Sequence, residues 1–249
     1  MTKFSVIFPY FNRPFHLKWC INSLLAQTFK DIEIIIIGEK IYNERETTVN
    51  GIKIINIEYI DTLNLSKMMN IAVEISTGEY LQFWQSDFII FQNYFSKLNS
   101  YVEQNNNDIL YVSRVLDIRI PTGDSIRENV INKPEIADHM DACIHRSVFE
   151  PFYSGFYGIY THWYVDWLCR MWEIKKLKFT FFKDLEIIHM PHDIGGLTQE
   201  MQIMEANLSY EIFHILRYEL KLNYKLYYLL DKKSMEIKNK ILEIRKNIK

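Results

Sequence analysis

Three polar segments that carry ligand-binding side chains each follow an apolar run in this sequence. They are Pro9 to Arg13, Gly38-Glu39 and Gln85-Ser86-Asp87. Together they offer one guanidinium group, which binds anions, and two carboxylates, which bind cations and N–H donors. In open α/β sheets, ligands bind beyond the carboxyl ends of the strands. If the preceding runs are parallel strands, the three segments meet at one edge, and the sequence predicts a binding site there.

The elements that would carry these segments alternate along the chain. The runs 4–8 and 32–37 are typical of buried strands, and Pro14 to Thr28 between them has apolar residues near helical spacing. This strand-helix-strand order predicts a parallel βαβ unit. Further along, the patterns predict strands at 52–57, 80–84, 109–115 and 179–188, and helices at 65–75, 91–104 and 164–174. The predicted fold class is therefore α/β, a mostly parallel central sheet flanked by helices.

Composition and charge limit the functional classes. The chain has 249 residues, of which 48% are apolar, and its length fits one large domain or one domain plus an appendage. We expect the domain at 1–216 and a basic, amphipathic helical tail at 217–249. Residues 1–216 are acidic, which argues against a dedicated nucleic-acid binder. The tail suits an anionic membrane surface or a partner helix, and simple packing on the domain explains its apolar side equally well.

The cysteines and the start of the chain predict a cytoplasmic protein. The three cysteines are far apart, without metal-binding spacing, so we expect buried, inert thiols in a reducing compartment. No apolar run approaches the roughly 18–20 residues that span a bilayer. The first apolar stretch is short and broken by Pro9, so it does not resemble a signal peptide.

Several common catalytic motifs are absent from the sequence. It contains no GxGxxG after the first predicted strand, no GxxxxGK[ST], no GxSxG and no HExxH. These absences argue against a dinucleotide-binding Rossmann domain, a P-loop nucleotidase, an α/β-hydrolase and a zinc protease.

Several ordered motifs resemble those of family 2 glycosyltransferases. The segment 5–14, SVIFPYFNRP, is similar to the family's opening SVIIPVYNRP. Residues 65–70, LSKMMN, resemble its LSKARN, and residues 76–83, STGEYLQF, resemble its ATGEYILF. The resemblance is close over about the first 95 residues. It implies the GT-A fold, in which a nucleotide-binding half of about 1–100 joins an acceptor-binding half of about 101–216.

This resemblance implies roles for residues near the donor nucleotide. Pro9 and Phe11 would lie beside the base, and Arg13 would reach the diphosphate. Glu39 stands where the family usually has an Asp-Asp-Gly-Ser segment, and would replace one aspartate as a base contact. The family's LSKARN arginine is Met69 here, so Lys67 is a candidate substitute, with exposed helix surface as the alternative.

The family's DxD motif corresponds to Gln85, Ser86 and Asp87, so one carboxylate is replaced. The resemblance implies that Gln85 and Ser86 face the nucleotide sugar and that Asp87 holds Mn²⁺ or Mg²⁺, because hard cations prefer carboxylate oxygen. The alternative for Asp87 is a helix N-cap. His189 or His192 would supply a second metal ligand, since imidazole also binds Mn²⁺; the alternative is ordinary loop histidines.

The family's catalytic E-D-x-D-L-x-x-R segment corresponds to 163–170, where its Glu-Asp pair is lost. Asp166 is the nearest surviving carboxylate and the first candidate for the general base, which takes the acceptor's proton. Asp141 is the second candidate. An ion pair between Asp166 and Arg170, four residues apart on a helix, is the alternative role for Asp166.

The implied function is transfer of a sugar from a nucleoside diphosphate sugar, expected to be a UDP-sugar, to a saccharide or lipid-linked acceptor. The resemblance implies a metal-assisted reaction with inversion, in bacterial surface polysaccharide synthesis. The expected location is the cytoplasm, including peripheral contact with the inner face of the plasma membrane through the tail. Two alternatives remain: a catalytically degenerate GT-A domain that binds a saccharide or a partner, and, less favoured, a nucleotidyltransferase.

Overall fold

The computed structural model describes residues 2–60, 64–105, 107, 109–117, 141–152 and 175–190, together with Tyr164, Trp167, Leu168, Arg170 and Met171. In chain order, the elements are β1 (Phe4–Tyr10), α1 (Pro14–Leu25), β2 (Ile32–Gly38), β3 (Glu46–Val49), β4 (Ile52–Glu58), α2 (Leu65–Ile75), β5 (Tyr80–Phe83), β6 (Phe88–Ile90), α3 (Tyr94–Gln104), β7 (Ile109–Asp117), β8 (Cys143–His145), a 3-10 helix (Arg146–Val148) and β9 (Lys178–His189). The strands form one sheet in the order β3-β4-β2-β1-β5-β8-β7-β9-β6.

Four neighbouring strands of the sheet, β4, β2, β1 and β5, are parallel, as the sequence predicts. Strand β1 pairs in parallel with β2 on one side and with β5 on the other, and β2 pairs in parallel with β4. Helix α1 connects β1 to β2, and α2 connects β4 to β5, which gives two crossover units. The carboxyl ends of β1, β2 and β5 therefore lie at one edge of the sheet. The predicted α/β fold class is confirmed.

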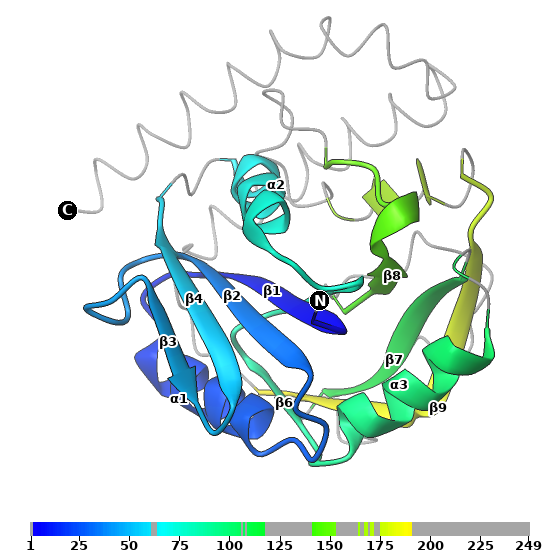
Figure 1. Ribbon diagram of the computed structural model, residues 1–249, viewed down its shortest axis with the longest axis horizontal. Helices are drawn as coiled ribbons and strands as arrows, with labels where there is room; N and C mark the ends of the chain where they lie inside the picture. The colour runs from blue at the N-terminus through cyan, green and yellow to red at the C-terminus, as the bar shows by residue number, and fades with distance from the viewer. Residues whose placement is uncertain are drawn as a thin grey trace, which may run out of the picture.

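Helices cover both faces of the sheet (Figure 1). Helices α1 and α3 pack on one face, where alternate β1 and β2 residues such as Phe8 and Ile36 are fully buried. Helix α2 packs on the other face against Ile7 and Ile35, together with Trp167. Because successive residues of a strand point to opposite faces, the continuous apolar runs of β1 and β2 supply both cores.

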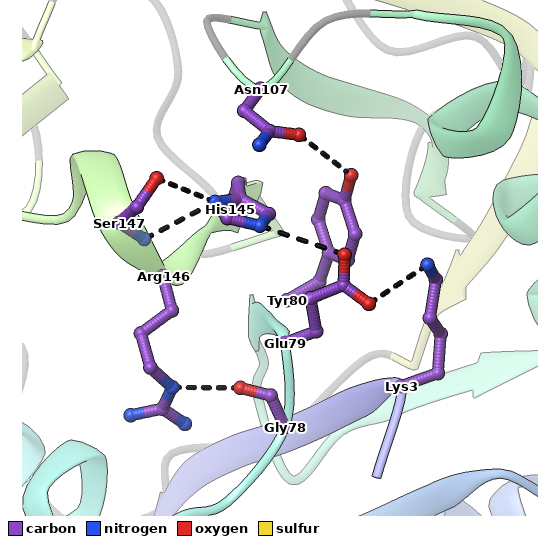
Figure 2. Close-up of polar contacts among 8 residues, drawn as sticks. All are labelled: Lys3, Gly78, Glu79, Tyr80, Asn107, His145, Arg146 and Ser147. Atoms are coloured by element: carbon purple, nitrogen blue, oxygen red, sulfur yellow. Dashed lines mark hydrogen bonds and ion pairs between the residues drawn. The ribbon is translucent and has the colours of Figure 1, made fainter. Parts of the chain in front are cut away.

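Side chains at the opposite, amino-terminal edge hold β5 between β1 and β8 (Figure 2). Glu79, just before β5, accepts a 3.0 Å bond from the Lys3 ammonium, and His145 Nε2 of β8 lies 3.6 Å from the same carboxylate. Arg146 Nε donates to the Gly78 carbonyl at 2.7 Å. These contacts lie at the amino-terminal end of β5. They hold the strand in place and lie away from the predicted binding edge at its carboxyl end.

Three strands, β3, β6 and β8, were not predicted. Strand β3 forms a hairpin with β4 through Asn50-Gly51, whose φ angles are 51° and 77°. Strand β6 occupies Phe88–Ile90, so the helix predicted at 91–104 begins at Tyr94. Strands β3 and β6 lie at the two edges of the sheet, and β8 lies inside it between β5 and β7. None of the three has the apolar length that reveals a buried strand.

Other predictions meet the described residues only in part. Cys20 and Cys143 are buried free thiols, as expected, and burial raises the pKa of both. The tail at 217–249, and with it the domain boundary at 216, lies outside the described residues. Among the helices that the structure describes, none has the length and apolar character to cross a membrane.

Candidate active site

The loops after β1 and β2 approach each other closely at the predicted edge. Gly38 has a φ of 142°, and a Cβ atom there would lie 2.1 Å from the Tyr10 carbonyl oxygen, so only glycine fits. The next residue, Glu39, donates its main-chain N–H to that carbonyl at 3.2 Å. Its carboxylate Oε2 accepts the N–H of Asn12 at 2.9 Å. Burial and then the charge of Glu39 raise the pKa of Tyr10.

Asp87 is the centre of a charged cluster beyond the carboxyl end of β5. Its side chain is nearly inaccessible to solvent, with 4% exposed. Oδ2 accepts a 3.1 Å bond from the Arg13 guanidinium and lies 3.6 Å from His189 Nε2. The structure therefore brings together three residues that the sequence places in separate segments. A carboxylate, a guanidinium and an imidazole in one place can bind a diphosphate and a cation.

The pairing of β6 with β9 carries His189 to Asp87. Phe88, the first residue of β6, pairs with His189, and the two rings meet edge to face at 5.7 Å. The Met190 N–H donates to the Asp87 carbonyl at 2.9 Å. Because the chain after Asp87 enters a strand, the alternative in which Asp87 is a helix N-cap is wrong.

Three residues predicted beside the nucleotide line the same edge. Pro9 pairs with Ile37 near the ends of β1 and β2. Phe11 is half-buried and packs against the core under α2. Lys67 is exposed on the first turn of α2, with its ammonium 5.5 Å from the centre of the Tyr59 ring.

Gln85 and Ser86 lie between β5 and Asp87. Ser86 is buried, whereas Gln85 is partly exposed. The Gln85 carbonyl accepts the Cys20 thiol at 3.7 Å and the Phe88 N–H at 3.3 Å. These main-chain contacts hold the turn that presents Asp87.

Of the two candidate bases, Asp141 lies within the described residues and Asp166 does not. Asp141 is 1% exposed and lies two residues before Cys143, the start of β8. Since β8 runs antiparallel to β5, Asp141 lies beside the carboxyl end of β5. Its Oδ2 accepts the Ser113 N–H at 3.2 Å. Asp166 and the second histidine candidate, His192, lie outside the described residues. Arg170, the alternative partner of Asp166, donates to the Pro151 carbonyl at 3.2 Å.

The donor set at Asp87 fits a divalent cation in part. Within the part of the chain that the structure describes, no group of three or more His, Cys, Asp or Glu side chains could hold a metal ion. Asp87 and His189 supply two ligands that face each other at 3.6 Å. Carboxylate and imidazole are suitable ligands for Mn²⁺, and a bound diphosphate and water would complete the shell. Arg13 shares the same carboxylate oxygen, so it would have to release Oδ2.

Asn56 on β4 is a site residue that the sequence reasoning missed. It is 6% exposed, and its Oδ1 accepts the Ile41 N–H at 2.6 Å. Its Nδ2 donates to the Glu39 carbonyl at 3.2 Å. The available signal was a lone amide side chain within the apolar strand Ile52–Glu58, because buried polar groups in strands need hydrogen-bond partners.

The comparison of sequences decides the family. Residues 5–142, more than half of the chain, match the family described as Glycosyl transferase family 2. The chain belongs to glycosyl transferase family 2. The resemblance that the motifs indicate is therefore confirmed at the level of the family.

Named relatives in this family match about half of the chain. Poly(ribitol-phosphate) beta-N-acetylglucosaminyltransferase TarP of Staphylococcus aureus is 33% identical over 118 residues, 44% of this chain and 36% of TarP. The uncharacterized glycosyltransferase EpsJ of Bacillus subtilis is 27% identical over 150 residues, 55% of this chain and 42% of EpsJ. The matched residues thus span less than half of either relative.

Solved structures share the fold at low sequence identity. S. aureus TarS 1–349 in complex with UDP-GlcNAc has a TM-score of 0.54 and 12% identity, covering 86% of this chain and 66% of that structure. The mannosyltransferase PcManGT of Pyrobaculum calidifontis, in complex with GDP-Man and Mn²⁺, has a TM-score of 0.55 and 11% identity, covering 86% and 64%. The GT-A fold expected of this glycosyltransferase is confirmed.

Proposed function

We propose that this glycosyltransferase moves a sugar from a UDP-sugar to a saccharide or lipid-linked acceptor. The observation that carries the proposal is the meeting of Arg13, Asp87 and His189 at the carboxyl edge of the sheet, next to the loop of Glu39. Supporting evidence comes from TarS, solved with UDP-GlcNAc, and from TarP, named as an N-acetylglucosaminyltransferase.

The diphosphate end of the donor would lie at Asp87. Arg13 carries a positive charge in the loop after β1. Its side chain is partly exposed, so its guanidinium can turn from Asp87 to a phosphate oxygen. Asp87 and His189 would hold Mn²⁺ or Mg²⁺, with His192 as a further candidate ligand. When bound, the cation supplies positive charge that stabilises the departing diphosphate.

The nucleoside end would lie at the β1 and β2 loops. Pro9 and Phe11 offer apolar surface for the base, and the Glu39 carboxylate accepts a hydrogen bond from a base N–H. Uracil presents one such donor, at N3. Gln85 and Ser86 would face the ribose, and Lys67 at the start of α2 adds a positive charge near the same edge.

The reaction would be a single displacement with inversion at the anomeric carbon. An acceptor hydroxyl attacks this carbon while a carboxylate takes its proton, and the bond to the diphosphate oxygen breaks. Asp166 is the first candidate for this base and Asp141 the second. Asp141 lies beside the carboxyl end of β5, but its hydrogen bond with the Ser113 N–H also fits a purely structural role.

The proposed setting is the synthesis of a bacterial surface polysaccharide, at the cytoplasmic face of the plasma membrane. TarP carries poly(ribitol-phosphate) in its name, which supports a polymeric acceptor. The basic, amphipathic sequence of 217–249 supports peripheral contact with anionic lipid.

Thermal unfolding with a panel of nucleoside diphosphates tests the donor proposal. UDP with Mn²⁺ should raise the melting temperature, because a ligand that binds only the folded state stabilises it. Asp87→Ala and His189→Ala should each remove most of the additional, Mn²⁺-dependent part of this shift. Lys18 lies on the exposed surface of α1, so Lys18→Ala serves as the control and should keep the Mn²⁺-dependent shift of the melting temperature. If no nucleotide raises the wild-type melting temperature at millimolar concentration, the proposal is wrong.

A further inference from the structure

We propose that Asn56 is a positioning residue for recognition of the nucleotide base and sets the preference for uracil over cytosine. It would act through the segment 39–42, which carries Glu39. The inference rests on the proposed function, in which the Glu39 carboxylate contacts the base.

Asn56 holds this segment at several main-chain groups. Its Oδ1 accepts the Ile41 N–H at 2.6 Å and lies 3.4 Å from the Tyr42 nitrogen. Its Nδ2 donates to the Glu39 carbonyl at 3.2 Å and lies 3.5 Å from the Ile36 carbonyl oxygen. One buried amide thus fixes peptide groups on both sides of Lys40. Without it, these groups lose their partner, and the segment loses its attachment to β4.

The same segment is fixed from the other side by the β1 loop. The Tyr10 carbonyl accepts the Glu39 N–H at 3.2 Å, and the Asn12 N–H donates to Glu39 Oε2 at 2.9 Å. Among the contacts of the described residues, only this oxygen of the carboxylate accepts a hydrogen bond, so Oε1 is available for a base. Glu39 is therefore held through its carboxylate by Asn12, through its main-chain N–H by Tyr10 and through its carbonyl by Asn56.

A carboxylate in a fixed position can distinguish pyrimidines. Uracil N3 carries a hydrogen and donates, whereas cytosine N3 is a lone-pair acceptor. A carboxylate oxygen that faces N3 therefore binds uracil and repels cytosine. An unpaired polar contact in a binding site lowers affinity strongly. If the segment moves, the oxygen no longer faces N3, and the preference falls. Asn56 would therefore affect base preference without touching the nucleotide.

Calorimetric titration of the full chain with UDP and CDP, both with Mn²⁺, tests this role. Asn56→Leu should weaken UDP binding about tenfold, the usual scale for one buried hydrogen-bonding group, and change CDP binding much less. In donor hydrolysis, it should raise KM more than it lowers kcat. Asn56→Asp keeps the acceptor for the Ile41 N–H and should recover part of the preference. If Asn56→Leu does not fold, Asn56→Ser, whose hydroxyl is too short to make these contacts, takes its place.

Ile55→Val is the matched control. Ile55 is the neighbouring buried residue of β4, and losing one methylene there lowers stability without affecting the amide contacts. The control should keep the wild-type ratio of the two dissociation constants. An unchanged ratio in Asn56→Leu, or in Asn56→Ser if the leucine variant does not fold, with UDP still bound by the wild type, would overturn the inference and leave the proposed function standing. If the wild type binds neither nucleotide, the proposed function fails and this inference fails with it.

Discussion

His189 Nε2 lies 3.6 Å from Asp87 Oδ2, although one residue ends β9 and the other precedes β6. The antiparallel pairing of these two strands brings them together, and the Met190 N–H donates to the Asp87 carbonyl. The cation site we propose is therefore built across two segments of the sheet. A ligand that binds both side chains should also stabilise this strand pair, because metal binding to a folded site contributes to folding free energy.

Arg13→Met should change the affinities for cation and nucleotide in opposite directions. Arg13 and a divalent cation compete for Asp87 Oδ2, so removal of the guanidinium should tighten Mn²⁺ binding in the absence of nucleotide. UDP binding in EDTA should weaken about tenfold, because a charge-assisted contact to the diphosphate is lost. Calorimetric titration measures both. Lys18→Met is the control, and a parallel change of both affinities in Arg13→Met would contradict the competition.

Gly38→Ala should destabilise the fold much more than Gly51→Ala. Both glycines have positive φ, but a Cβ at Gly38 would overlap the Tyr10 carbonyl, whereas nothing lies within 4 Å of one at Gly51. Backbone strain alone accounts for about 1 kcal/mol at Gly51, and we expect roughly 3 kcal/mol at Gly38. Urea unfolding of the two variants measures the difference. Equal losses of unfolding free energy would show that the two loops can separate to admit the methyl group.

Asp166→Asn and Asp141→Asn separate the two candidate bases. Loss of the base should lower turnover ~10²–10⁴-fold and leave UDP affinity nearly unchanged, because the diphosphate binds at Asp87. A purely structural aspartate should instead change the melting temperature and keep turnover. Both quantities should be measured on the same preparation. If turnover survives both substitutions in an active enzyme, neither residue is the base.

Deletion of 218–249 should reduce binding to anionic vesicles while donor hydrolysis continues. The basic residues of the tail are attracted to negatively charged lipid, and its apolar side can enter the interface. Co-sedimentation with vesicles that contain anionic lipid measures this binding. Equal binding by both proteins would exclude a membrane role for the tail, and unfolding of the shortened protein would favour simple packing.

The sequence predicts the parallel half of the fold well. β1, β2, β4 and β5 have apolar or nearly apolar runs, and α1 and α2 have a helical period, because each element buries a large apolar surface. Strands β3, β6 and β8 were missed, since each is only three or four residues long. The Asn50-Gly51 pair was the available signal for the β3 hairpin, because both positions of its turn need a positive φ.

The sequence alone determined the family motifs and the order of the elements. It therefore placed Arg13, Glu39 and Asp87 at one edge, because parallel strands end on the same side. Only the tertiary structure decided that Arg13 and His189 meet the same oxygen of Asp87, and that Asn56 holds the Glu39 segment. These contacts depend on the pairing of strands distant in sequence and on side-chain directions across the sheet. No local pattern encodes such distances, because they arise when the whole sheet is assembled.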